Sequence, residues 1–351
     1  MFEYLLFLSS GLFLGWSLGA NDSANIFGTA VGTKMLRFTT AATIASIFII
    51  LGAIISGQNT TETLNALGGV NTLPAAFAVS LSATLAVRVM LKSGISVSIS
   101  QTIIGAILGW NVYNHQPTDK QTLVNICSCW VMCPIISGLI AVTLYFIVKK
   151  LLHHSKLHIL WQDLIVRSGM ILTTALGGFA LGANNMADVV GVFVQSCAFD
   201  DIVLFGFIPL SGIQVLFLIG AIAVSIGVFT YSKKVISTVG KGVLTFSPAV
   251  AWIVILSQSL VLILFSSDSL ENFLISIGLP PLPAVPVSST QAVIGAIVGI
   301  GLAKGGKEIK WSLVGKLVLG WVTSPLMAFI LSYISLSFME NVFKQPVFAT
   351  F

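Results

Sequence analysis

Apolar residues fill ten stretches of the chain, and each stretch is long enough to span a bilayer core of about 30 Å. The stretches cover roughly residues 4–33, 38–57, 74–92, 94–113, 122–148, 165–198, 202–231, 247–267, 273–303 and 311–339. Their length and density predict helices, because the strands of a membrane β-barrel are about 10 residues long and alternate in polarity. We therefore expect an all-α integral membrane protein with about ten membrane segments.

The composition agrees with a membrane protein. Of the 351 residues, 56% are hydrophobic and 8% are charged, whereas soluble domains carry roughly 25% charged residues. The spans show no pairing of a nucleophile with a base and no set of metal ligands, so we do not expect an enzyme.

The basic residues predict the orientation. If the N-terminus lies outside and the segments alternate, fourteen of the 17 basic residues fall on the inner side: Lys34, Arg37, Arg88, Lys92, Lys149, Lys150, Lys156, Arg167, Lys233, Lys234, Lys241, Lys304, Lys307 and Lys310. Cytoplasmic loops are enriched in Lys and Arg, so we place both termini outside. The net charge of +5 then reflects membrane topology, and we expect no nucleic-acid partner.

The chain contains two copies of one pattern. Three features recur in the same order in its two halves: LGANDSANIFG at 18–28 and LGANNMADVVG at 181–191, VSISQTIIGAILG at 97–109 and VSSTQAVIGAIVG at 287–299, and Trp130 with Pro134 and Trp321 with Pro325. This order predicts a duplication. We place the first repeat at 1–148, a basic cytoplasmic connection at 149–167 and the second repeat at 168–351.

The two repeats are predicted to be inverted in the membrane. Each has about five crossings, an odd number, so the second enters from the opposite side, as is usual in secondary transporters. Two topologies stay open for the Ser/Thr-Gln segments: each crosses fully, or residues 74–113 and 248–303 form re-entrant hairpins. The four prolines between 280 and 286 interrupt any helix there.

Each repeat carries one carboxylate within an apolar span. An ionisable residue there costs about 2.5–3.5 kcal/mol on insertion scales and is by default functional. Positions three apart share one side of a helix, and carboxylate and amide oxygens suit a small alkali cation or a proton. No Lys or Arg is near in sequence, so we predict cation ligands at Asp22 and Asn25 in the first repeat and at Asn185 and Asp188 in the second.

The Ser/Thr-Gln segments predict an anion site. We expect helices to begin there, where backbone N–H groups and the helix dipole favour oxyanions. The residues are Ser98, Ser100, Gln101 and Thr102 in the first repeat, and Ser288, Ser289, Thr290 and Gln291 in the second. In the alternative, the Ser and Thr hydroxyls only donate to carbonyl groups of their own helix. Arg88 and Lys92 either extend this site or, as we favour, lie at the inner interface.

Other small or polar residues predict packing. Glycines spaced by four, such as Gly105 and Gly109, are typical of close helix contacts. Gly19 and Gly182, which precede the Ala-Asn pairs, are also candidates for local unwinding. The cysteines at 127, 129 and 133 lie in one apolar helix but not all on one face, so we expect packing and no metal site.

These ordered motifs closely resemble those of the inorganic phosphate transporter family, the sodium- or proton-coupled phosphate permeases, over about residues 11 to 335. The resemblance implies phosphate between the two signature helices and the two Ser/Thr tips, with cations beside the signature aspartates. It adds Asn21 and Asn184 as phosphate ligands. The sequence departs from the family pattern in the GANNMAD order of its second signature, in Gln101 and Gln291 where many members have His, and in its short inner connection.

We therefore expect a multi-pass protein of the cell membrane that acts as a secondary active symporter. It would import inorganic phosphate coupled to Na⁺ by alternating access, without a cofactor. The alternatives are H⁺ coupling, or a sulfate or related oxyanion permease on the same scaffold. An anion channel is disfavoured, because it needs no buried acidic residues. The expected partners are phosphate, Na⁺, the lipid bilayer and, by resemblance, a second copy of the chain.

Overall fold

The computed structural model describes residues 2–93, 95–154, 158–197, 199–204, 206–239, 247–278, 282–307 and 309–349. Within these residues the chain is mostly helical, and the recorded strands form one antiparallel hairpin, β1 (Ile202–Leu204) with β2 (Ile208–Leu210). The prediction of a helical membrane protein is confirmed. The hairpin corrects one detail, because residues 202–210 were expected to begin a membrane helix.

The helices of the first half are α1 (Phe2–Ser23), the π-helix η1 (Ala24–Gly28), α2 (Thr29–Gly32), α3 (Phe38–Ser56), α4 (Thr61–Leu67), α5 (Leu73–Lys92), α6 (Ile99–Tyr113) and α7 (Lys120–His154). Those of the second half are α8 (Ile159–Val190), the 3-10 helix η2 (Gly191–Phe193), α9 (Gly212–Thr230), α10 (Ser232–Val239), α11 (Pro248–Leu264), α12 (Asp268–Ser276), α13 (Ser289–Ala303) and α14 (Trp311–Asn341). The ends of α7 and α8 therefore occupy most of the expected connection at 149–167, of which residues 155–157 lie outside the described residues.

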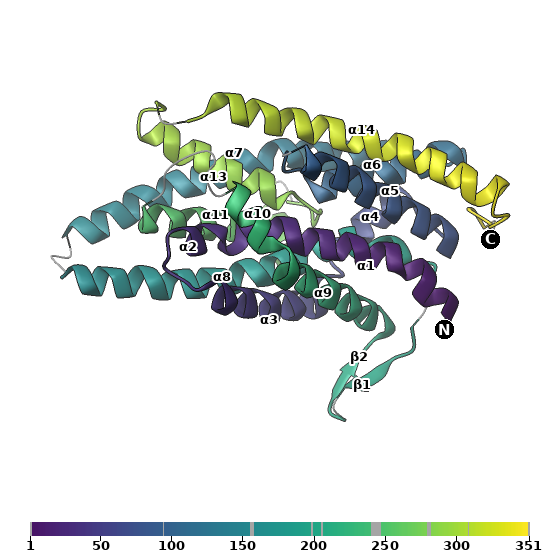
Figure 1. The fold of residues 1–351 in the computed structure, drawn as a ribbon, viewed down its shortest axis with the longest axis horizontal. Coiled ribbons are helices and arrows are strands. Elements are labelled where there is room, and N and C mark those ends of the chain that lie inside the picture. Colours follow the sequence, from purple (N-terminus) through teal and green to yellow (C-terminus); the bar gives the residue numbers. More distant parts are fainter. Residues whose placement is uncertain are drawn as a thin grey trace.

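The long helices lie along one axis and alternate in direction. Helices α1 and α7 run away from the end at which the N-terminus lies, and α8 and α14 run back toward it (Figure 1). The N- and C-termini consequently lie at the same end of the bundle. This arrangement agrees with an even number of crossings, whereas the side of the membrane on which that end lies stays a prediction.

The packing of helices is exchanged between the two halves. Helix α1 packs against α9, and its counterpart α8 packs against α3. Likewise, α6 of the first half packs against α14 of the second, and α13 of the second half packs against α7 of the first. Within each half, the contact of α5 with α1 corresponds to that of α11 with α8. The main buried apolar core runs through both halves. Equivalent pairs of this kind are expected of two repeats related by a pseudo-twofold axis, and the inverted repeat itself is taken up as a proposal below.

Glycines allow the close approach of helices at these crossings. A Cβ atom at Gly105 on α6 would lie 2.2 Å from the carbonyl oxygen of Pro325 on α14, and one at Gly295 on α13 would lie 2.1 Å from that of Pro134 on α7. The packing role expected for the glycines is therefore confirmed here. By contrast, Gly19 and Gly182 lie within helical turns of α1 and α8, so the local unwinding considered for them does not occur.

Helices α6 and α13 are too short to cross a bilayer. Each has 15 residues, or about 22 Å at 1.5 Å per residue, against a hydrocarbon core of about 30 Å. Residues 95–98 lead into α6 and residues 282–288 into α13 without helical structure. The N-cap residues Ser98 and Ser288 are buried. The helix lengths therefore favour the re-entrant topology over full spans.

By length and composition, fewer helices could cross a membrane than the ten apolar stretches of the sequence predicted. Among the described residues six helices are long and apolar enough to cross a membrane, or seven if α11 and α12, which are bent by 70°, form one broken span. The expected segment at 273–303 is divided between α12 and α13, and the segment at 94–113 contains only α6 as a helix. The count of about ten segments stays a prediction.

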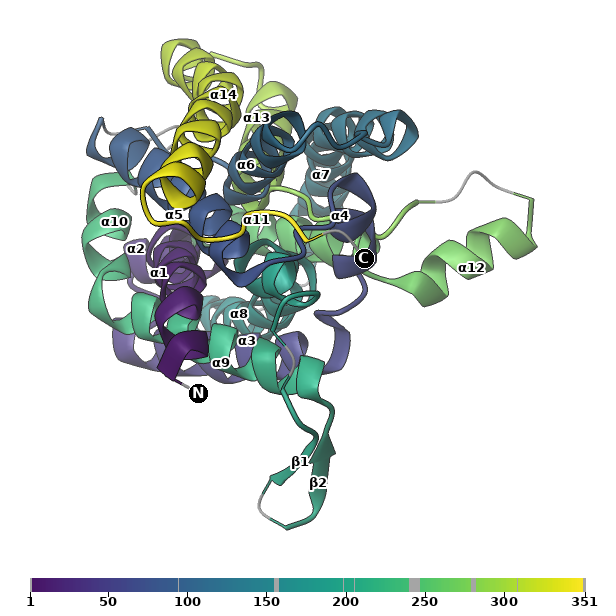
Figure 2. The same ribbon diagram turned by 90° about the vertical axis from the view of Figure 1, so that its right-hand side faces the viewer.

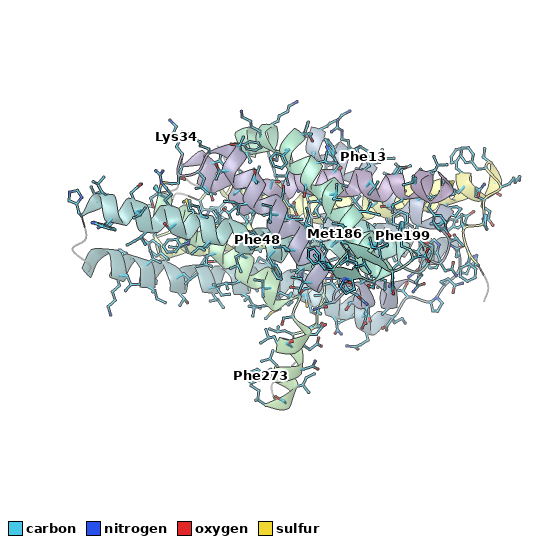
Figure 3. All side chains as sticks on the ribbon, turned by 90° about the horizontal axis from the view of Figure 1, so that it is seen from below. Phe13, Lys34, Phe48, Met186, Phe199 and Phe273 are labelled. Atoms are coloured by element: carbon cyan, nitrogen blue, oxygen red, sulfur yellow. The ribbon has the colours of Figure 1, made fainter. Side chains whose placement is uncertain are left out.

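Two elements project away from the bundle. Seen along the bundle, the β1–β2 hairpin and α12 both extend outward from the packed helices (Figure 2). Phe273 on α12 is 57% exposed and lies far from the body, whereas Met186 on α8 is fully buried (Figure 3). Asn185 and Asp188, close to Met186 in sequence, are buried as well.

Candidate functional site

The first signature places its polar residues where α1 passes into the π-helix η1. Asp22 lies in the last turn of α1 and Asn25 lies in η1. Short π-helical segments often occur at functional sites. The Ser289 hydroxyl donates to Asp22 Oδ2 at 2.7 Å, and Asn25 Nδ2 donates to the hydroxyls of Ser289 at 2.9 Å and Thr290 at 3.2 Å. Asp22 and Asn25 therefore face the first turn of α13.

The second signature makes the corresponding contacts from α8. The Ser100 hydroxyl donates to Asp188 Oδ2 at 2.5 Å. Asn185 Nδ2 donates to the Ser100 hydroxyl at 2.9 Å and to Asp188 Oδ2 at 3.0 Å. Asn185 and Asp188 therefore face the first turn of α6.

The contacts of the two signatures cross between the halves of the chain. Asp22 and Asn25 of the first half bond to the helix start of the second, and Asn185 and Asp188 of the second half bond to that of the first. Four segments that are far apart in sequence thus meet at one buried place. The structure brings together all four predicted cation ligands with Ser100, Ser289 and Thr290.

Asn21 and Asn184 hold the extended segments before the short helices. Asn21 Nδ2 donates to the Val97 carbonyl at 3.3 Å, and Ser96 donates to Asn21 Oδ1 at 3.3 Å. Asn184 Nδ2 donates to the Val285 carbonyl at 3.0 Å, and the Val287 amide donates to Asn184 Oδ1 at 2.8 Å. Their amides are engaged by the protein itself, and direct phosphate binding by these two residues stays a prediction.

Some of the predicted anion ligands bond within their own helix. The hydroxyls of Ser98 and Ser288 accept from the backbone amides of Gln101 and Gln291, both at 3.2 Å, and so cap α6 and α13. Thr102 donates to the Ser98 carbonyl at 2.6 Å. Thr102 thus shows the bonding to a helix carbonyl that was considered as the alternative, whereas Ser98 and Ser288 act as N-caps. Ser100 and Ser289 instead bond across the halves.

The site holds two buried carboxylates that have no basic partner among the described residues. Asp22 is 3% exposed and Asp188 is fully buried. In the described part of the chain the recorded ion pair joins Arg167 and Asp163 at the surface, and neither buried aspartate pairs with Lys or Arg. Buried charges in proteins are paired or coordinate a cation, so each aspartate needs a cation or a proton from outside the chain.

The basic residues considered for the anion site lie elsewhere. The Arg88 guanidinium lies 5.8 Å from the ring centre of Tyr231, which follows α9, and Lys92 is exposed. Their place at the inner interface of the membrane stays a prediction. Cys129 and Cys133 are buried, as packing requires, whereas Cys127 is exposed. No metal-binding group of His, Cys, Asp and Glu occurs among the described residues.

Sequence reasoning missed several buried polar groups. The backbone of Val97, Val285 and Val287 provides hydrogen-bond partners that carry no side-chain signal. Gln258 on α11 is fully buried, and neither its Nε2 nor its Oε1 has a partner among the described residues. An amide side chain in the apolar stretch 247–267 was the signal that could have revealed it.

Comparison with known proteins assigns the chain to a family. The profile of the Phosphate transporter family matches residues 18–271 and 282–350, which include both signatures and both short helices. The chain belongs to the phosphate transporter family. The resemblance drawn from the repeated motifs is thereby confirmed. The members of the family are transporters, in agreement with the expectation that this protein is not an enzyme.

Relatives within the phosphate transporter family cover nearly the whole chain. A "Putative phosphate permease" of Methanocaldococcus jannaschii is 28% identical over 331 residues, which cover 94% of this chain and 93% of that protein. Another protein of that description, from Haemophilus influenzae, is 24% identical over 413 aligned positions that cover 91% and 92% of the two chains. The order of the aligned segments is therefore shared with these relatives over nearly the whole of each chain.

A solved structure has the same fold. The protein described as "The sodium-dependent phosphate transporter" superimposes with a TM-score of 0.75 over 97% of this chain and 100% of that chain, at 19% sequence identity. At that identity the likeness establishes the fold and leaves the bound ions to be argued from the residues of this chain.

Proposed function

We propose that this chain is a secondary active symporter that imports inorganic phosphate coupled to Na⁺ by alternating access. The observation that carries the proposal is the pair of crossed contacts, Asp22 with Ser289 and Asp188 with Ser100. They join two buried carboxylates to two helix starts, so groups that suit cations and groups that suit an anion lie side by side.

The helix starts supply the anion side of the site. The N-terminal turns of α6 and α13 end inside the protein, next to the two signatures. The first N–H groups of a helix lack partners within the helix, and the helix dipole places positive partial charge there. A tetrahedral oxyanion fits two such ends that meet, which supports phosphate as the substrate of this family member.

The signatures supply the cation side. Asp188 Oδ1 and Asn185 Oδ1 are buried and accept no hydrogen bond from the described residues. Carboxylate and amide oxygens are hard ligands that suit Na⁺. Na⁺ is therefore proposed as the ion carried with phosphate, with one ion beside Asp188. A second ion beside Asp22 is proposed from the correspondence of the two signatures, although Asp22 Oδ1 accepts from Asn21 Nδ2 at 2.6 Å. The solved structure of similar fold is itself described as sodium-dependent. H⁺ is the second candidate, since either carboxylate can take a proton instead.

The crossed contacts also suggest how access alternates. Each signature bonds to the tip of the other half, so a movement that separates one signature from its opposite tip opens the site at one end only. Transporters built from inverted repeats open to either side by exchanging the conformations of their halves. The exchanged packing of α1 with α9 and of α8 with α3 supports this scheme. We place the repeats at 1–148 and 168–351.

Reconstitution into liposomes tests the proposal. Vesicles with the purified protein should accumulate labelled phosphate above its external concentration when Na⁺ is higher outside, and should not do so with K⁺ in place of Na⁺. The conservative Asp163→Asn variant, which alters a surface carboxylate, serves as the control and should match the wild type. Equal uptake of phosphate with and without a gradient of any cation would contradict symport.

A further inference from the structure

Three helices of this chain begin with the same Ser-x-x-Gln pattern. They are α6 with Ser98 and Gln101, α13 with Ser288 and Gln291, and α9 with Ser211 and Gln214. In this pattern the Ser hydroxyl accepts from the Gln backbone amide, and the Gln side-chain oxygen accepts from the Ser backbone amide. The chain thus contains its own reference for how such a Gln behaves.

Only the helix start outside the site completes the pattern. At α9 the Ser211 amide donates to Gln214 Oε1 at 3.0 Å, and the Gln214 amide donates to the Ser211 hydroxyl at 3.4 Å. At α6 and α13 the hydroxyl accepts as expected, but Gln101 Oε1 and Gln291 Oε1 accept nothing from the described residues. Gln101 is 3% exposed and Gln291 is 4% exposed, so both oxygens are buried acceptors without a donor.

The position of these oxygens favours a donor carried by an anion. A buried acceptor without a partner is costly, and a cation is one way to satisfy it. However, both oxygens belong to the first turn of a helix, where the dipole repels cations and attracts anions. The groups that meet both conditions are the hydroxyls of a protonated oxyanion, which brings negative charge and a hydrogen-bond donor together.

We infer that Gln101 and Gln291 select a protonated tetrahedral oxyanion by accepting hydrogen bonds from its hydroxyl groups. This inference rests on the proposed function. Phosphate and arsenate retain one or two hydroxyls near neutral pH, whereas sulfate has none and would leave both oxygens unpaired. Sites built to hydrogen-bond a substrate hydroxyl reject analogues that lack it, because the buried polar groups are then unsatisfied. The two glutamines would thus exclude sulfate.

The selection can be tested by replacing each glutamine with methionine, a side chain of similar size that is a poor hydrogen-bond acceptor. We would compare Gln101→Met, Gln291→Met and the double variant with the control Gln214→Met at α9. In liposomes with a fixed inward Na⁺ gradient, the concentrations of unlabelled phosphate, arsenate and sulfate that halve uptake of labelled phosphate would be measured. In each site variant, the half-inhibitory concentrations of phosphate and arsenate should rise about tenfold, which is the effect of one lost hydrogen bond to a charged ligand. The half-inhibitory concentration of sulfate should stay unchanged. Gln214→Met should keep the wild-type ratios.

Other outcomes separate the inference from the proposed function. If wild-type vesicles accumulate no phosphate, the proposed function fails. If wild-type vesicles accumulate phosphate but sulfate competes as well as phosphate does, the proposed selection by Gln101 and Gln291 is wrong and the proposed transport stands. The same conclusion follows if the variants lose competition by phosphate and by sulfate to the same degree. A shift in the Na⁺ requirement at unchanged anion affinity would assign the oxygens to the cation. Should the Met variants not fold, Gln291→Glu keeps an acceptor and should reject sulfate at least as strongly as the wild type; improved sulfate competition would overturn the inference.

Discussion

Ser289 and Asp22 stand 267 positions apart in the chain, yet the Ser289 hydroxyl donates a hydrogen bond of 2.7 Å to the Asp22 carboxylate. The matching bond from Ser100 to Asp188 spans 88 positions in the opposite sense, from the first half to the second. Each half therefore contributes a carboxylate to the other half's helix start. The predictions below follow from this reciprocal arrangement.

Loss of either buried carboxylate should abolish coupled uptake. In Asp22→Asn and Asp188→Asn the side chain keeps its size but loses the charge that would attract a cation. We expect both variants to insert and elute as the wild type does, and to accumulate no phosphate under a Na⁺ gradient. Proteoliposome uptake measures this, with Asp163→Asn as the control. A variant with normal uptake and normal cation dependence would remove its aspartate from the mechanism.

Removal of the Ser100 hydroxyl should affect both substrates. From the sequence alone, Ser100 is an anion ligand whose loss weakens phosphate affinity more than Na⁺ dependence. Because Ser100 donates to Asp188, we now expect Ser100→Ala to raise the half-saturating concentrations of phosphate and Na⁺ by about tenfold or more, as for one hydrogen bond to a charged group. Ser276→Ala on the exposed helix α12 is the control. A change in thermal stability alone would leave Ser100 with a packing role only.

Much of this site could be predicted from the sequence because each of its motifs occurs once in each half of the chain. The repeated signatures identified Asp22 and Asp188, and the repeated Ser/Thr-Gln segments identified the starts of α6 and α13. The pairing across the halves could not be predicted, since it depends on which tip meets which signature in three dimensions. Likewise, Asn21 and Asn184 bond to backbone groups, which no side-chain pattern reveals.

The fold was predictable to a similar degree. Long apolar stretches gave the membrane helices, since a bilayer imposes a minimum length on each. The same criterion does not distinguish a full span from the 15-residue helices α6 and α13, whose polar first turns are buried among other helices. It failed for residues 202–210, where an apolar run of Ile, Val, Leu and Phe forms a hairpin beside the bundle. Apolar composition alone does not distinguish a short exposed strand from the beginning of a helix.

Alanine at the glycine crossings should destabilise the protein. A Cβ atom at Gly105 or Gly295 would meet a backbone carbonyl of α14 or α7 at 2.2 or 2.1 Å, and this atom cannot rotate away. We expect Gly105→Ala and Gly295→Ala to cost about 1–3 kcal/mol, as overpacking typically does, and to lower the melting temperature in detergent. Gly315→Ala, at a position with open space, is the matched control on α14. Equal melting of all three variants would refute the close crossing.

The orientation can be read by cysteine labelling. Lys34 and Lys344 are exposed, and the positive-inside rule places Lys34 in the cytoplasm and the C-terminal Lys344 outside. In a background without the four native cysteines, Lys344→Cys should react in intact cells with a maleimide that cannot cross the membrane. Lys34→Cys should react only after the membrane is opened. The reverse pattern would invert the assigned topology.

The central claim is that the two carboxylates, one from each half, carry Na⁺ with phosphate. A phosphate dianion entering against a negative interior meets about 2.3 kcal/mol of opposing work per charge per 100 mV, and two Na⁺ ions cancel it. Phosphate and Na⁺ should each raise the affinity for the other, as linkage requires. The most direct measurement is the simultaneous uptake of labelled Na⁺ and labelled phosphate by the same proteoliposomes, at varied external Na⁺ and then under a pH gradient without Na⁺. We predict at least two Na⁺ per phosphate, a sigmoidal dependence on Na⁺ and little uptake in its absence. Full phosphate uptake driven by the pH gradient alone would contradict the account and make the protein a proton symporter.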